Sequence, residues 1–163
     1  MSKSGLPRAH MFVAWSSHNN QVVASLPAER LDFDAANLPA PILRSFEEAI
    51  TCHAAACYVA AALMVRKTME ELCLDQKAIG GNLKEKIAAL GKTIVLPKDL
   101  LEGLDDLRLL GNDAAHVESQ SFNNIGKEEL EVAIEFAKEV LKATYQYESL
   151  RKRLAALKKP GIP

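Results

Sequence analysis

The sequence predicts an all-α protein of about five helices, preceded by a short irregular or extended N-terminal segment. Alanine and leucine are abundant, whereas aromatic residues make up only 6% of the 163 residues, and this balance favours helices over sheet. Glycine and proline are modest in number, so long stretches of helix-forming residues run without interruption. Within these stretches apolar residues recur every three or four positions, which is typical of one buried helix face.

Length, charge and cysteine content narrow the class of protein further. A chain of this length with 48% hydrophobic residues fits one domain with a proper core. The formal net charge is only -1, so any contact with RNA or DNA would have to be local. The three cysteines are odd in number and form no C-x-x-C pair, and with no secretory leader they predict a reduced, cytoplasmic protein. The most apolar stretch, residues 49–65, contains His53 and is bounded by charges, so we expect no membrane contact.

The first part of the chain differs from the rest. Residues 1–37 are expected to be irregular, and the short apolar pieces at 11–15 and 21–24 flank a polar turn in a pattern typical of a hairpin. Two prolines then end this segment, because proline suits the first turn of a helix. The helical domain is therefore predicted for residues 38–158.

The first two helices are expected on either side of a turn at residues 53–56. Without that turn, residues 42–75 would form one helix of about 50 Å at 1.5 Å per residue, which is long for so small a domain. The turn makes residues 42–52 one helix and residues 57–74 the next. The residues predicted to bring the second helix into the core are Val59, Leu63, Met69 and Leu72.

Three further helices are expected downstream. Asn82 can cap the third helix and Gly91 ends it, while a fourth begins after Pro97. The fourth helix either continues to His116 or bends at Gly111. The fifth is predicted to run from residue 127 to about 158, with an apolar side formed by Leu130, Ile134, Ala137, Leu141, Tyr145 and Leu150.

The segment from Arg108 to His116 holds the best candidate site. At about 100° per residue, steps of four place Arg108, Asn112 and His116 on one face of a continuous helix. An arginine, an amide and an imidazole suit phosphate or RNA backbone chemistry. Alternatively, the Gly-Asn pair marks a helix end and the histidine is a core or capping group.

Other candidates are weaker. Arg66 and Glu70 form an i, i+4 pair, which is a surface ion pair unless it faces the Arg108 segment and completes one site. His53 and Cys57 have the spacing of two metal ligands but lack a second pair, so core packing is favoured and no metal or cofactor is expected. The basic residues 151–153 either complement a helix C-terminus or contact RNA.

Three segments of the sequence form a recognisable set: LPAPILRSFEEA at residues 38–49, AAALMVRKTMEEL at 60–72 and LRLLGNDAAH at 107–116. Together they resemble a bacterial domain-of-unknown-function family that is found alone and fused to restriction endonuclease subunits. The resemblance covers about residues 31–148, and that family is similar in turn to the HEPN superfamily of small helical bundles. The resemblance implies an HEPN-like bundle, a homodimer, and a protein or RNA partner.

Two functions follow from this resemblance. The first is a metal-independent ribonuclease. In it Arg108 would stabilise the charge on the phosphate, His116 would act as general acid or base, and Asn112 would hold either of them in position. Arg66 and Glu70 would support these residues from outside the site, with Glu70 orienting one of the arginines.

The other function is a non-catalytic interaction or accessory module in a restriction or anti-phage setting. In such a module Arg66, Glu70, Asn112 and His116 would form a buried polar network. Seven residues lie between Arg108 and His116, more than in ribonucleases of that superfamily, and Leu109 replaces their polar residue. These departures favour the interaction module.

Overall fold

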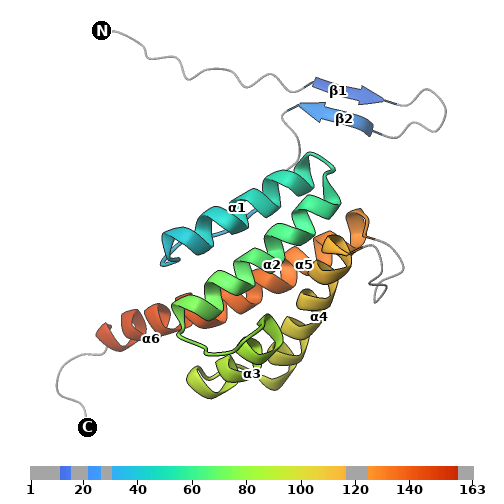
Figure 1. The fold of residues 1–163 in the computed structure, drawn as a ribbon. Helices are drawn as coiled ribbons and strands as arrows, with labels where there is room; N and C mark the ends of the chain where they lie inside the picture. The colour runs from blue at the N-terminus through green and yellow to red at the C-terminus, as the bar shows by residue number, and fades with distance from the viewer. Residues whose placement is uncertain (1–11, 16–21, 27–30, 117–124, 158–163) are drawn as a thin grey trace, which may run out of the picture.

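The computed structural model describes residues 12–15, 22–26, 31–116 and 125–157. In these ranges a helical bundle follows a two-stranded hairpin (Figure 1). The predicted all-α fold with about five helices is confirmed, since α5, η1 and α6 follow one another as one continuous helix. The elements are β1 (Phe12–Trp15), β2 (Val22–Leu26), α1 (Ala40–Ala54), α2 (Tyr58–Asp75), α3 (Leu83–Thr93), α4 (Lys98–Ala115), α5 (Lys127–Leu141), the π-helical segment η1 (Lys142–Gln146) and α6 (Tyr147–Ala156).

The hairpin pairs β1 with β2 in antiparallel register, with Phe12 opposite Leu26 and Ala14 opposite Ala24. The polar turn expected between the two strands lies outside the described residues. Among the elements of the described chain, each strand contacts only the other.

The turn predicted between the first two helices is confirmed. Helix α1 ends at Ala54, and Ala56 takes a left-handed backbone conformation with φ of 57°. The backbone N–H of Cys57 then bonds to the Cys52 carbonyl at 2.8 Å, which closes the turn before α2 begins. As a result α1 packs along α2, and the two form the most extensive helix pair of the bundle (Figure 1).

The expected core of α2 is partly wrong. Met69 and Leu72 are fully buried, but Val59 is 51% exposed and Leu63 is 37% exposed. The buried stripe of α2 consists of Ala61, Ala62, Val65, Thr68, Met69, Leu72 and Cys73. Val59 and Leu63 lie outside this stripe, on the outer face of the helix.

Helices α3 and α4 begin where the sequence predicts. The Asn82 side chain accepts a hydrogen bond from the Glu85 backbone N–H at 3.0 Å, which caps α3. Helix α4 follows Pro97 and continues through Gly111 to Ala115, so this glycine does not end the helix.

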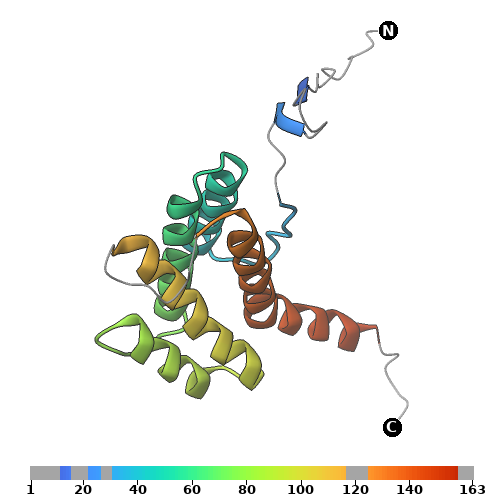
Figure 2. The ribbon, with the colours of Figure 1, turned by 90° about the vertical axis from the view of Figure 1, so that its right-hand side faces the viewer.

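The last helix extends beyond the bundle. Leu130, Ile134, Ala137 and Leu141 of α5 are buried as predicted. Leu150 is 53% exposed, so its predicted place in the core is wrong. Past the π-helical segment, α6 leaves the bundle and has no buried residue (Figure 2). None of the helices in the described ranges is long and apolar enough to cross a membrane.

Candidate functional site

The three polar residues of α4 are placed differently from one another. Arg108 and Asn112 lie one turn apart on the continuous helix, as the spacing predicts. His116 is the C-terminal cap of α4 and has an extended backbone with φ of -132°. Its backbone N–H still bonds to the Asn112 carbonyl at 2.9 Å, but its side chain is exposed to solvent. The helical face predicted for all three therefore ends before His116.

Arg108 is held by a carboxylate on its own helix. Its Nε donates to Asp105 Oδ1 at 2.6 Å and its Nη2 donates to Asp105 Oδ2 at 3.2 Å. This hydrogen bonding raises the pKa of Arg108 and lowers that of Asp105. The Asp105 carboxylate therefore balances the positive charge of Arg108, whose side chain is only 13% exposed.

Arg66 joins α2 to α4. Its Nη1 donates a hydrogen bond to Asn112 Oδ1, and its Nε lies 3.1 Å from Glu70 Oε1. The two polar insertions predicted from the sequence therefore do face each other, and the structure brings together Arg66, Glu70 and Asn112. His116 does not belong to this cluster. The expected network is corrected to these three residues, which we call the α2–α4 bridge.

Gly111 allows the helices to approach closely at the α2–α4 bridge. A Cβ atom built on Gly111 would lie 2.5 Å from Arg66 Cβ, which is shorter than any normal contact. The sequence around Gly111 indicates only a possible break in the helix. A glycine inside an otherwise regular helical pattern is itself a signal of close packing, and it identifies the contact point here.

Two surface grooves lie near these helices. One has a volume of about 460 Å³ and is lined by Arg66 and Glu70 together with Leu63, Lys67, Glu71, Leu74 and Lys86. The other, which we call the α4–α5 groove, has a volume of about 640 Å³. Neither groove is lined by Arg108, Asn112 or His116, so neither brings that trio together around a ligand.

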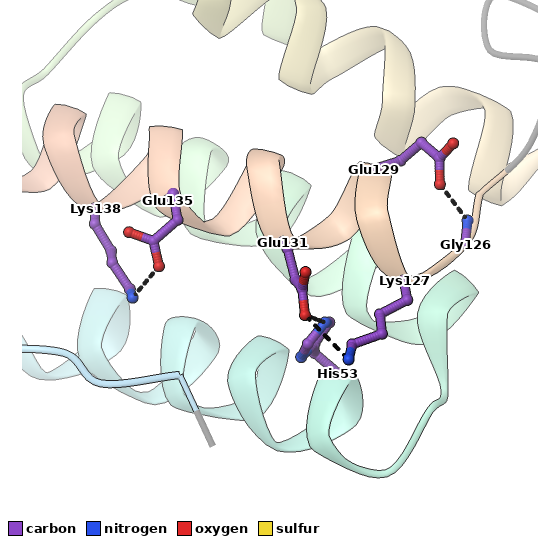
Figure 3. A network of polar contacts seen from close by, with 7 residues as sticks. All are labelled: His53, Gly126, Lys127, Glu129, Glu131, Glu135 and Lys138. Atoms are coloured by element: carbon purple, nitrogen blue, oxygen red, sulfur yellow. Dashed lines mark hydrogen bonds and ion pairs between the residues drawn. The ribbon is translucent and has the colours of Figure 1, made fainter. Parts of the chain in front are cut away.

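A second polar cluster joins α1 to α5 (Figure 3). His53 is buried, with its Nε2 atom 3.7 Å from Glu131 Oε1, and Lys127 Nζ lies 3.5 Å from the same oxygen. Neither ring nitrogen of His53 has a hydrogen-bond partner among the described residues. The prediction that His53 packs in the core is therefore confirmed. The same prediction is wrong for Cys57, which is exposed in the turn between α1 and α2.

Within the described ranges no group of three or more histidine, cysteine, aspartate or glutamate side chains is arranged to hold a metal ion. His53 and Cys57, the pair with ligand spacing, differ in exposure because one faces α5 and the other lies in the turn.

The fold and the bridge define a small helical-bundle domain with a polar link between two of its central helices. The chain belongs to the family described as Domain of unknown function (DUF4145), whose model matches residues 47–159. The predicted membership of a domain-of-unknown-function family is thereby confirmed. No curated protein and no solved structure matches the chain.

Proposed function

We propose that this protein is a non-catalytic interaction module in which the polar residues of α2 and α4 hold the bundle together. The observation that carries the proposal is that both arginines near the candidate site, which are partly buried, are already paired with other side chains. Arg66 is bound to Asn112, and Arg108 is bound to Asp105. A general acid and base site needs groups aimed at an open position for the reacting atom, whereas these groups are aimed at one another.

The wider setting of this role is also part of the proposal. The motif at residues 107–116 and its partner segments support an HEPN-like bundle that serves a restriction or anti-phage system as an accessory. Function is carried by sites rather than by folds, so the resemblance alone supplies neither substrate nor partner.

A metal-independent ribonuclease remains the second candidate, and the exposure of His116 favours it. An exposed imidazole at the end of a helix is accessible to a substrate, as a general acid or base must be. For this function Arg108 would have to exchange Asp105 for a phosphate. Its bidentate contact with the carboxylate opposes that exchange.

The experiment is a cleavage assay with labelled single-stranded RNA and transfer RNA, with and without chelator. It compares the wild type with His116→Ala, which should fold normally because this side chain is exposed. We expect no cleavage by either protein and equal melting temperatures. Cleavage that survives chelator and disappears in the folded variant would establish the ribonuclease and overturn the proposal.

A further inference from the structure

Helix α6 and the residue that caps its C-terminus, Leu157, carry an apolar stripe with no other described element packed against it. Tyr147, Leu150, Leu154 and Leu157 recur at steps of three and four, which is the heptad spacing of a helix that pairs with another surface. All four are at least half exposed. Among the described elements α6 contacts only η1, and both ribbon views show it projecting from the bundle (Figures 1 and 2). We call these four residues the α6 stripe.

Positive charge flanks the α6 stripe on both sides. At about 100° per residue, Arg151 and Arg153 lie roughly 80° to either side of the centre of the stripe. Neither forms an ion pair within the described part of the chain. Lys152 lies on the opposite face and is already paired with Glu148 at 2.8 Å. The two arginines are thus placed along the edges of the contact face, as charged residues are in paired helices.

The α4–α5 groove has the complementary character. Its floor and walls are largely apolar, with Leu107, Leu110, Val132, Ala133 and Phe136 among the lining residues. Its charged lining residues are all acidic, with Asp106 on the α4 wall and Glu128 and Glu129 on the α5 wall. Val132 lines the groove and is 66% exposed, so its side chain is accessible to a docking partner.

The dimensions of the stripe and the groove agree. The lining residues span eight positions of α4 and nine of α5, and the distance from first to last is about 10 to 12 Å at 1.5 Å per residue. The α6 stripe covers eleven positions, with about 15 Å from its first residue to its last. One helix with a basic edge on each side would therefore fill the groove and place an arginine opposite the acidic residues of each wall.

We propose that α6 of one copy docks into the α4–α5 groove of a second copy, and that the two copies exchange this contact reciprocally. Within one copy the contact is impossible because α6 continues α5 through η1 and meets no part of α4. Reciprocal exchange buries both stripes and both grooves and closes a dimer with twofold symmetry. Pairing of two α6 helices with each other is less favourable, because the stripe covers less than two heptads and carries the same basic edges on both copies.

The first test measures the mass of the full-length protein in solution by light scattering and sedimentation. We expect a dimer for the wild type and a monomer for Leu154→Glu, with dimerisation weakened about thirtyfold or more. Ala155→Glu adds the same charge one position away, off the stripe, and should remain a dimer. Val132→Glu, in the groove, should behave as Leu154→Glu does. All three positions are exposed, so unchanged circular dichroism would show that the variants fold.

A charge exchange then tests which surfaces meet. One variant carries Arg151→Glu and Arg153→Glu, and the other carries Asp106→Arg and Glu128→Arg. Each alone should be monomeric, because like charges face each other. Their mixture should restore the dimer, since both contacts between the two variants then join opposite charges. A groove variant that still forms dimers alone would show that α6 pairs elsewhere, and a wild type that stays monomeric would also overturn the proposal.

This inference rests on the proposed interaction role, but different experimental results would overturn the two proposals. A dimer that cleaves RNA through His116 would overturn the non-catalytic role and leave the docking of α6 intact. A monomer without cleavage would overturn the docking and leave the non-catalytic role.

Discussion

Arg66 on α2 donates a hydrogen bond to the side-chain oxygen of Asn112 on α4, across 46 positions of sequence. The same guanidinium forms an ion pair with Glu70, one turn further along α2. A charged donor bound to an amide in a partly buried site contributes more than a neutral surface contact. The α2–α4 bridge therefore fixes how two central helices of the bundle meet.

Replacing Gly111 tests how closely α2 and α4 approach. In Gly111→Ala the new methyl group would lie 2.5 Å from Arg66 Cβ, so the helices must separate. We expect a loss of about 1 to 3 kcal/mol in the free energy of unfolding, measured by urea denaturation.

The matched control is Gly91→Ala in α3. There the new methyl group would meet the end of the flexible Leu101 side chain at 2.9 Å, which can rotate away. This variant should be neutral or more stable by up to about 1 kcal/mol, because alanine is the better helix former. Equal behaviour of the two variants would show that Gly111 plays no special part in packing.

The ion pair of Asp105 and Arg108 predicts a pH dependence of stability. Hydrogen bonding to Arg108 lowers the pKa of Asp105 in the folded protein, so the unfolded chain binds the proton more readily. The stabilisation is therefore fully present above the ordinary pKa of about 3.9 and is lost as pH falls through the lower folded value.

Asp105→Asn should accordingly reduce the free energy of unfolding at neutral pH, by less than about 1 kcal/mol because the carboxylate is partly exposed. The difference from the wild type should shrink as the pH is lowered below about 4. Denaturation curves at a series of pH values measure it. A difference that stays constant down to the lowest pH would contradict the assigned ion pair.

Replacing His53 should stabilise the protein, in contrast to the replacement of Asp105. Its two ring nitrogens are buried without a hydrogen bond among the described residues, which normally destabilises a protein. His53→Leu should therefore raise the free energy of unfolding at neutral pH by about 1 kcal/mol. Glu131→Gln serves as the control and should change stability by less than about 0.5 kcal/mol. A strongly destabilised His53→Leu protein would show that the ring has a partner that stabilises it.

The helices could be predicted from the sequence because their signals are local. Asn82 caps α3 and Pro97 precedes α4, and each effect involves residues within one turn of the helix. The turn after Ala54 could also be predicted, since an unbroken helix would exceed the size of the domain. The buried face of α2 could not, because the first eight residues of that helix are all apolar and their spacing does not single out one face.

The candidate site was predictable only in part. Spacing placed Arg108 and Asn112 on one face and paired Arg66 with Glu70. Spacing does not reveal which partner a side chain selects across helices. Arg108 thus bonds to Asp105 in the preceding turn, and Asn112 bonds to α2. Nor could it place His116 beyond the end of the helix, because the terminal residue of a helix depends on how the following chain leaves it.

The most direct test of the bridge is a double-mutant cycle on Arg66 and Asn112. Arg66→Met keeps the apolar stem against Gly111 and removes the guanidinium, and Asn112→Ala removes its acceptor. Unfolding free energies of both single variants, the double variant and the wild type give the coupling. The bridge predicts a coupling of about 1 kcal/mol or more. Effects that add to within about 0.5 kcal/mol would show that the two side chains do not stabilise each other, and would contradict a structural role for the α2–α4 bridge.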